Sequence, residues 1–86
     1  SPSLAPHIIS KTKLPVIKYQ FIQVDLNHIR FLYETEYDDL SDTQKMEVTS
    51  IVKSHISNEI HLEFIRTKDF VLSKNGKFRI VIVEFE

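Results

Sequence analysis

The stretch VIKYQFIQVDLNHIRFLYE, residues 16–34, decides the fold. Residues 16–25 alternate with a period of two and are rich in aromatic and β-branched side chains, and residues 29–33 repeat the pattern after Leu26-Asn27. This period is typical of β-strands. The stretch therefore predicts two strands that pair as an antiparallel hairpin.

Aromatic side chains recur along both predicted strands of the hairpin. They resemble a platform on which single-stranded nucleic-acid bases stack, but alternating aromatic residues on paired strands more often form a core. Lys and Arg total 11 against 12 Asp and Glu, a net charge of −1, so the chain has no overall basic field for nucleic acid. We therefore assign these residues to the core: Tyr19, Phe21, Phe31 and Tyr33.

Further elements are predicted on either side of the hairpin. A short helix over residues 4–11, with Ser3 as its N-cap and Pro6 in its first turn, ends before Pro15. The capping box Ser41-Asp42-Thr43-Gln44 starts a second helix, whose apolar stripe runs to about residue 57. Alternation at residues 60–64 predicts a third strand, and FRIVIVEF at 78–85 predicts a fourth that is buried on much of both faces.

The order of these elements is α-β-β-α-β-β. Amphipathic helices and strands bury their apolar sides only against each other, so we expect an α+β fold. Its sheet is expected to be small, open and mostly antiparallel, with about four strands and helical cover. The whole chain, residues 1–86, is expected to form one domain.

Composition excludes several classes of protein. With 86 residues and no Cys, the chain is neither a disulfide scaffold nor a thiolate metal site. Its apolar runs are far shorter than the roughly 20 residues that cross a bilayer, and no signal-peptide pattern opens it. We expect no membrane span, no bound nucleic acid and, by default, a cytoplasmic location. A deep enclosed active site is not expected at this size.

The strongest candidate for chemistry is the polar excursion of residues 67–77. It holds the single glycine of the chain, Gly76, and Asn75-Gly76 predicts a tight turn. Lys74, Lys77 and Arg79 around that turn are the densest positive cluster in the sequence. A flexible ammonium suits a phosphoryl or carboxylate oxygen whose charge shifts during transfer, but the same residues also fit a solvated hairpin turn.

Two other groups carry weaker signals. His7, His28, His55 and His61 show no metal-ligand spacing, so we expect no metal site among them. Acidic residues gather at positions 34–42, where they could attract Mg²⁺ or a basic partner. Carboxylates before a helix N-terminus more often favour the helix dipole.

Several short motifs follow one another along the chain: IKYQFIQ at residues 17–23, the hairpin, a single helix, an I-x-L-x-F strand at 60–64 and GKFR at 76–79 before a terminal strand. In these ordered motifs the chain resembles the C-terminal domain of the phenylacetate–CoA ligase-like branch of adenylate-forming enzymes, which includes capsular-polysaccharide-associated relatives. Together they span nearly the whole chain, from about Ser3 to Glu86.

This resemblance implies a mobile lid on a larger N-terminal adenylation domain that binds ATP, Mg²⁺ and a small carboxylic acid. Lys77 matches the family's lysine, which reaches the acyl carboxylate and the adenylate phosphate. Lys74, Gly76 and Arg79 would belong to the same substrate-contacting loop. The lid would then turn for acyl transfer, often to coenzyme A. Asn75 stands where relatives commonly carry Ser or Thr, and the nucleotide-binding parts would precede Ser1, so this chain alone is not expected to catalyse.

Two alternatives stay open. The chain fits a non-enzymatic α+β interaction module that offers a sheet edge or the acidic surface of residues 34–42 to a protein. It also fits a module that binds a phosphoanion or RNA through Lys74, Lys77 and Arg79.

Overall fold

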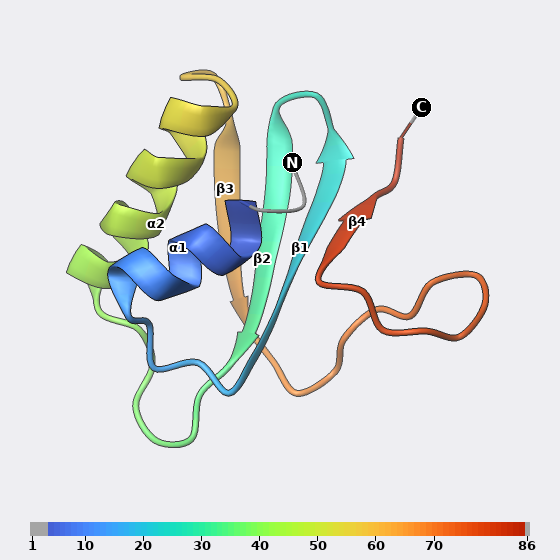
Figure 1. Cartoon of the computed structure of the whole chain (residues 1–86), viewed down its shortest axis with the longest axis horizontal. Helices are drawn as coiled ribbons and strands as arrows, with labels where there is room; N and C mark the ends of the chain where they lie inside the picture. Colours follow the sequence, from blue (N-terminus) through green and yellow to red (C-terminus); the bar gives the residue numbers. More distant parts are fainter. Residues whose placement is uncertain (1–3, 86) are drawn as a thin grey trace.

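The computed structural model describes residues 4–85 and contains two helices and four strands in the predicted order (Figure 1). The elements are α1 (Leu4–Thr12), β1 (Lys18–Asp25), β2 (His28–Glu34), α2 (Asp42–His55), β3 (His61–Arg66) and β4 (Val81–Val83). The α+β class and the element order are confirmed. Pro6 lies in the first turn of α1 as expected, whereas the expected N-cap Ser3 lies outside the described residues.

The sheet is mixed, so the expectation of a mostly antiparallel sheet is wrong. Its strand order is β3-β2-β1-β4; β1 and β2 form the predicted antiparallel hairpin, but β2 pairs with β3, and β1 with β4, in parallel. The reason lies in the connections. Helix α2 carries the chain back to the end where β2 began, and a helical crossover makes the next strand parallel. The segment 67–80 then crosses the sheet and brings β4 alongside β1 (Figure 1).

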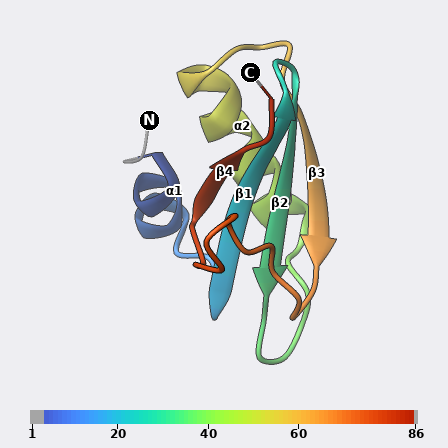
Figure 2. The same cartoon turned by 90° about the vertical axis from the view of Figure 1, so that its right-hand side faces the viewer.

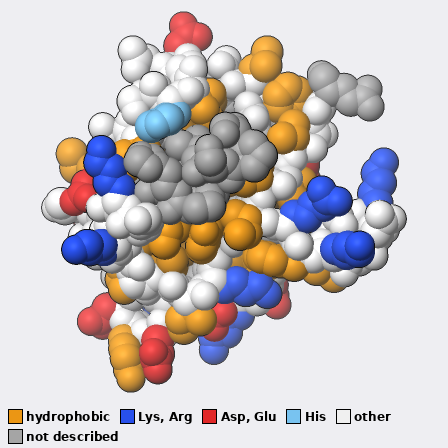
Figure 3. Space-filling view, in the orientation of Figure 1, with side chains coloured by type: hydrophobic (Ala, Val, Ile, Leu, Met, Phe, Trp, Pro, Cys, Tyr) orange, Lys and Arg blue, Asp and Glu red, His pale blue; other side chains and the backbone are white. Residues whose placement is uncertain are grey.

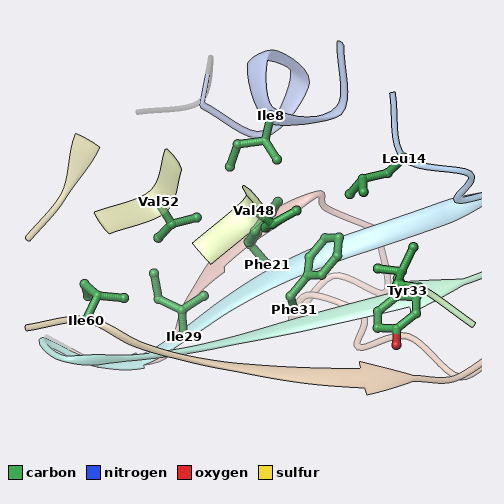
Figure 4. Close-up of a cluster of buried hydrophobic side chains, with 10 residues drawn as sticks. Ile8, Leu14, Phe21, Ile29, Phe31, Tyr33, Val48, Val52 and Ile60 are labelled. Carbon is green, nitrogen blue, oxygen red and sulfur yellow. The ribbon is translucent and has the colours of Figure 1, made fainter. Parts of the chain in front are cut away.

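Both helices cover the same face of the sheet (Figure 2). The register aligns Phe21, Phe31 and Phe64 across three strands, and this row faces the helices. Ile8 of α1 and Val48 of α2 point onto the row from above (Figure 4). The aromatic residues of the hairpin are therefore core residues, as predicted: Phe21, Phe31 and Tyr33 are buried, and Tyr19 packs against them.

Helix α2 begins where its sequence predicted. The Ser41 hydroxyl accepts from the Gln44 amide and the Gln44 side chain accepts from the Ser41 amide, so both halves of the capping box are formed. A cap of this kind satisfies amides that have no partner inside the helix. Val48 and Val52 are fully buried, which fixes the helix face that meets the sheet.

The final strand is shorter and more exposed than predicted. β4 covers only Val81–Val83, flanked by backbone bonds of Ile80 and Glu84 to β1. It lies at the edge of the sheet, with Val81 and Val83 exposed. The prediction of a strand over 78–85 that is buried on much of both faces is therefore wrong. Phe78 and Arg79 belong instead to the segment that folds over the sheet, and an edge strand has a neighbour on one side only.

Within the described residues, neither helix has the length or the apolar run that crossing a bilayer requires.

Candidate functional site

The candidate site is a two-stranded ribbon, residues 70–79, which we call the Lys77 ribbon. A backbone bridge joins Leu72 to Phe78, the Ser73 amide donates to the Lys77 carbonyl over 2.8 Å, and the Gly76 amide donates to the Ser73 carbonyl over 2.8 Å. Gly76 has a φ of 75°, a backbone conformation that glycine adopts without penalty. The predicted Asn75-Gly76 turn is therefore confirmed.

The ribbon presents three cations. Lys74 and Lys77 lie in the turn, Arg79 lies at the base of the second stem, and all three side chains are exposed. In residues 4–85 the ion pairs are Asp25 with His28 and Arg30 with Glu63, so none of the three ribbon cations is neutralised by a carboxylate. The ribbon projects beyond β4 (Figure 1), and Figure 3 shows Lys and Arg side chains gathered on that projection.

Apolar side chains accompany these cations. Leu72, Phe78 and Ile80 are exposed beside the charged residues. The Phe70 and Phe78 rings meet edge to face, with their centroids 5.9 Å apart. An exposed apolar surface next to unpaired cations suits a second protein surface better than bulk water.

The surface of the described residues carries shallow hollows. One, of about 790 Å³, runs along the outer side of α2 and is lined by residues such as Lys45, Met46, Thr49 and Lys53. None of its lining residues belongs to the Lys77 ribbon.

Within the acidic segment 34–42, the Asp39 carboxylate serves the fold. The buried Tyr33 hydroxyl donates to Asp39 Oδ1 over 2.5 Å, and the same oxygen accepts from the Leu40 amide. The Tyr33 hydrogen bond holds the pKa of Asp39 below its ordinary value, while burial and the Asp39 carboxylate raise the pKa of Tyr33. Arg66 donates to Thr35 Oγ1 and to the Tyr37 carbonyl, which fixes the same loop.

The histidines form no metal centre in the described part of the chain, where no three His, Asp or Glu side chains converge. His28 Nδ1 lies 2.7 Å from Asp25 Oδ1, and this hydrogen bond is the main cause that lowers the pKa of Asp25. The His28 and His61 rings lie 5.8 Å apart across the β2–β3 pair. His55 contacts the Ile51 carbonyl near the end of α2, and the side chain of His7 lies outside the described part of the structure.

Two residues that sequence reasoning passed over hold the ribbon on the sheet. Gln20 and Lys18 lie on the face of β1 opposite the helices. Gln20 bonds to the backbone of the ribbon, and the Lys18 ammonium lies over two of its aromatic rings. One signal in the sequence indicates that a segment covers this second face. Ile22 and Leu32 lie on it and are apolar, whereas a face exposed to water would carry polar residues; both are buried in the structure.

Comparison with known proteins adds no further constraint: no family model, curated protein or solved structure matches this chain.

Proposed function

We propose that this chain is the C-terminal lid of an adenylate-forming, ATP-dependent carboxylic acid ligase, as its motifs suggest, and that Lys77 is the residue it delivers to the reaction. The observation that carries the proposal is the position of Lys77 in the turn of an ordered ribbon that projects beyond the sheet edge. Its ammonium is exposed and unpaired within residues 4–85, so it is available to an oxyanion held by another domain.

The chemistry follows from the charge. In adenylation, a carboxylate oxygen bonds to the α-phosphorus of ATP while the bond to the pyrophosphate oxygen breaks, and negative charge is redistributed over the phosphoryl oxygens. An ammonium placed there stabilises that charge without acting as base or nucleophile. The described residues offer neither a phosphate loop nor a carboxylate cluster for Mg²⁺, so ATP, Mg²⁺ and the acid would be held by the adenylation domain.

The exposed apolar residues beside the cations support closure against that domain. Leu72, Phe78 and Ile80 would be covered when the lid closes, and exclusion of water strengthens the interaction of Lys77 with its oxyanion. Rotation of the lid would withdraw the ammonium before acyl transfer, for which coenzyme A is the proposed acceptor.

The test is ATP–pyrophosphate exchange in the parent enzyme that carries this domain. Lys77→Ala is expected to lower the exchange rate by about 10²–10³-fold, the range for loss of one transition-state donor. Lys68→Ala is the matched control, because Lys68 is an exposed lysine of the same connection outside the ribbon. Exchange that is equally fast in the Lys77→Ala and wild-type enzymes would remove Lys77 from the reaction.

The edge strand favours one second candidate, the non-enzymatic interaction module. Ile80 and Glu84 bond to β1 through their backbone, so the alternate residues Val81 and Val83 direct their amides and carbonyls outward, where an extended segment of a partner could pair. Val83→Pro removes one outward amide and spares the bonds to β1. If Val83→Pro abolishes binding of a partner protein and Lys77→Ala leaves ATP–pyrophosphate exchange unchanged, the interaction module is favoured over the lid.

A further inference from the structure

The polar side chain of Gln20 is fully buried on the side of the sheet that the helices do not cover. In Figure 2, α2 lies behind the sheet and the connection from β3 to β4 crosses in front of it. The side chain of Gln20 extends from β1 to that connection. Burying a side-chain amide costs free energy unless its donors and acceptor form hydrogen bonds. The partners of the Gln20 amide therefore indicate its structural role.

All the partners of the Gln20 amide are backbone groups of the Lys77 ribbon. Gln20 Nε2 donates to the Val71 carbonyl and to the Arg79 carbonyl, each over 2.8 Å, and Gln20 Oε1 accepts from the Val71 amide over 2.9 Å. One side chain therefore bonds to both stems of the ribbon at its base. The bridge between Leu72 and Phe78 and the Ser73–Lys77 turn lie beyond this attachment.

Lys18 adds a second attachment from the same face of β1. Its ammonium lies 5.0 Å from the centre of the Phe70 ring and 4.4 Å from the centre of the Phe78 ring, and these residues belong to opposite stems. Cation–π contacts of this kind are favourable even at exposed sites. Lys18 and Gln20, two residues apart on one strand, thus each contact both stems of the ribbon.

We propose that Gln20 is the positioning residue for Lys77: it fixes the base of the ribbon to β1, so the Lys77 ammonium keeps one place relative to the sheet. The role of Gln20 in catalysis rests on the proposed function. The three hydrogen bonds between Gln20 and the ribbon, which we call the clamp, concern this chain alone. An ammonium that must meet an oxyanion gains from a fixed position, since a displacement of about 1 Å can lower a rate by about 100-fold.

The clamp is tested first by amide hydrogen exchange on the 86-residue chain. The Val71 amide is expected to exchange at least about tenfold more slowly than the Lys74 amide after correction for intrinsic rates, although Val71 is an exposed residue. This measurement needs no variant, so it does not depend on a mutant that folds. Equal protection of the two amides would overturn the clamp.

Gln20→Leu is the direct variant, since it keeps the approximate volume and removes all three bonds. Exchange at Val71 and in the Ser73–Lys77 turn is expected to accelerate by about tenfold or more, while amides of α2 stay protected. Gln23→Leu is the matched control, a second glutamine of β1 whose side chain makes none of these contacts. Unchanged ribbon exchange in Gln20→Leu, or equal acceleration in Gln23→Leu, would contradict the proposal.

The catalytic meaning is tested in the parent enzyme by a double-mutant cycle on ATP–pyrophosphate exchange. Gln20→Leu is expected to lower kcat by about 100-fold with little change in the KM for ATP, and to have no further effect in a Lys77→Ala background. Independent, multiplicative losses would show that Gln20 does not act through Lys77. If Lys77→Ala alone does not slow ATP–pyrophosphate exchange, the proposed function fails. Amide hydrogen exchange on the isolated chain still decides whether the clamp exists.

Discussion

Replacement of Tyr33 by Phe should destabilise the domain through one hydrogen bond. The Tyr33 side chain is 1% exposed, and its hydroxyl donates to Asp39 Oδ1 over 2.5 Å. The variant keeps the aromatic ring, which stacks on Phe31 with a centroid distance of 5.5 Å. The core packing is therefore preserved, and the change isolates the bond between the strand and the loop before α2.

The expected loss is about 1 kcal/mol. Hydrogen bonds to charged groups typically contribute about 1.5–3 kcal/mol, but the Asp39 carboxylate is exposed and keeps the Leu40 amide, so water recovers part of the loss. For a domain of this size, about 1 kcal/mol corresponds to a decrease in Tm of about 4–8 °C.

The loss should depend on pH in a defined direction. The folded-state pKa of Asp39 is lowered from 3.8, so its contribution is present above that value and disappears as the pH falls through the folded-state pKa. The folded-state pKa of Tyr33 is raised from 10.0, so its contribution is present below that value and disappears as the pH rises through the folded-state pKa. The difference between wild type and Tyr33→Phe should therefore be largest near neutral pH.

Urea unfolding at neutral and acidic pH measures this difference. Tyr37→Phe is the matched control, since Tyr37 lies in the same loop and is 79% exposed; it should change the free energy of unfolding by less than about 0.5 kcal/mol. A Tyr33→Phe loss of the same size at pH 3 and pH 7, or a loss no larger than that of the control, would refute the assigned role of the bond.

Two further substitutions test the core and the ribbon. Val48→Ala should lower the free energy of unfolding by about 2–3 kcal/mol in urea denaturation, because Val48 is fully buried between α2 and the sheet, whereas Met46→Ala on the exposed side of α2 should cost less than about 0.5 kcal/mol; equal losses would contradict the helix orientation. Gly76→Ala places a side chain at a φ of 75° with no atom within 4 Å of the new Cβ, so only backbone strain of about 1 kcal/mol is expected. The Ser73 amide should then exchange about fivefold faster, and an unchanged rate would contradict the left-handed turn.

The candidate site was predictable where its signals are local. The Asn75-Gly76 dipeptide predicted the turn because positive φ is a property of the residue, and the density of Lys74, Lys77 and Arg79 is visible in the sequence. The clamp was not predictable in the same way. Gln20 occupies the polar position of an alternating strand, and its partners Val71 and Arg79 lie 51 and 59 residues away.

The sequence by itself determined the elements of this protein: the hairpin, the capped helix α2, the order of strands and helices and the ribbon turn. Each depends on a period, a cap or a turn residue that acts over a few residues. Only the tertiary structure decided the mixed sheet, the edge position of β4 and the attachment of the Lys77 ribbon to Gln20. Strand neighbours are chosen by contacts between distant segments, and the alternation of a single strand is the same whichever neighbour it pairs with.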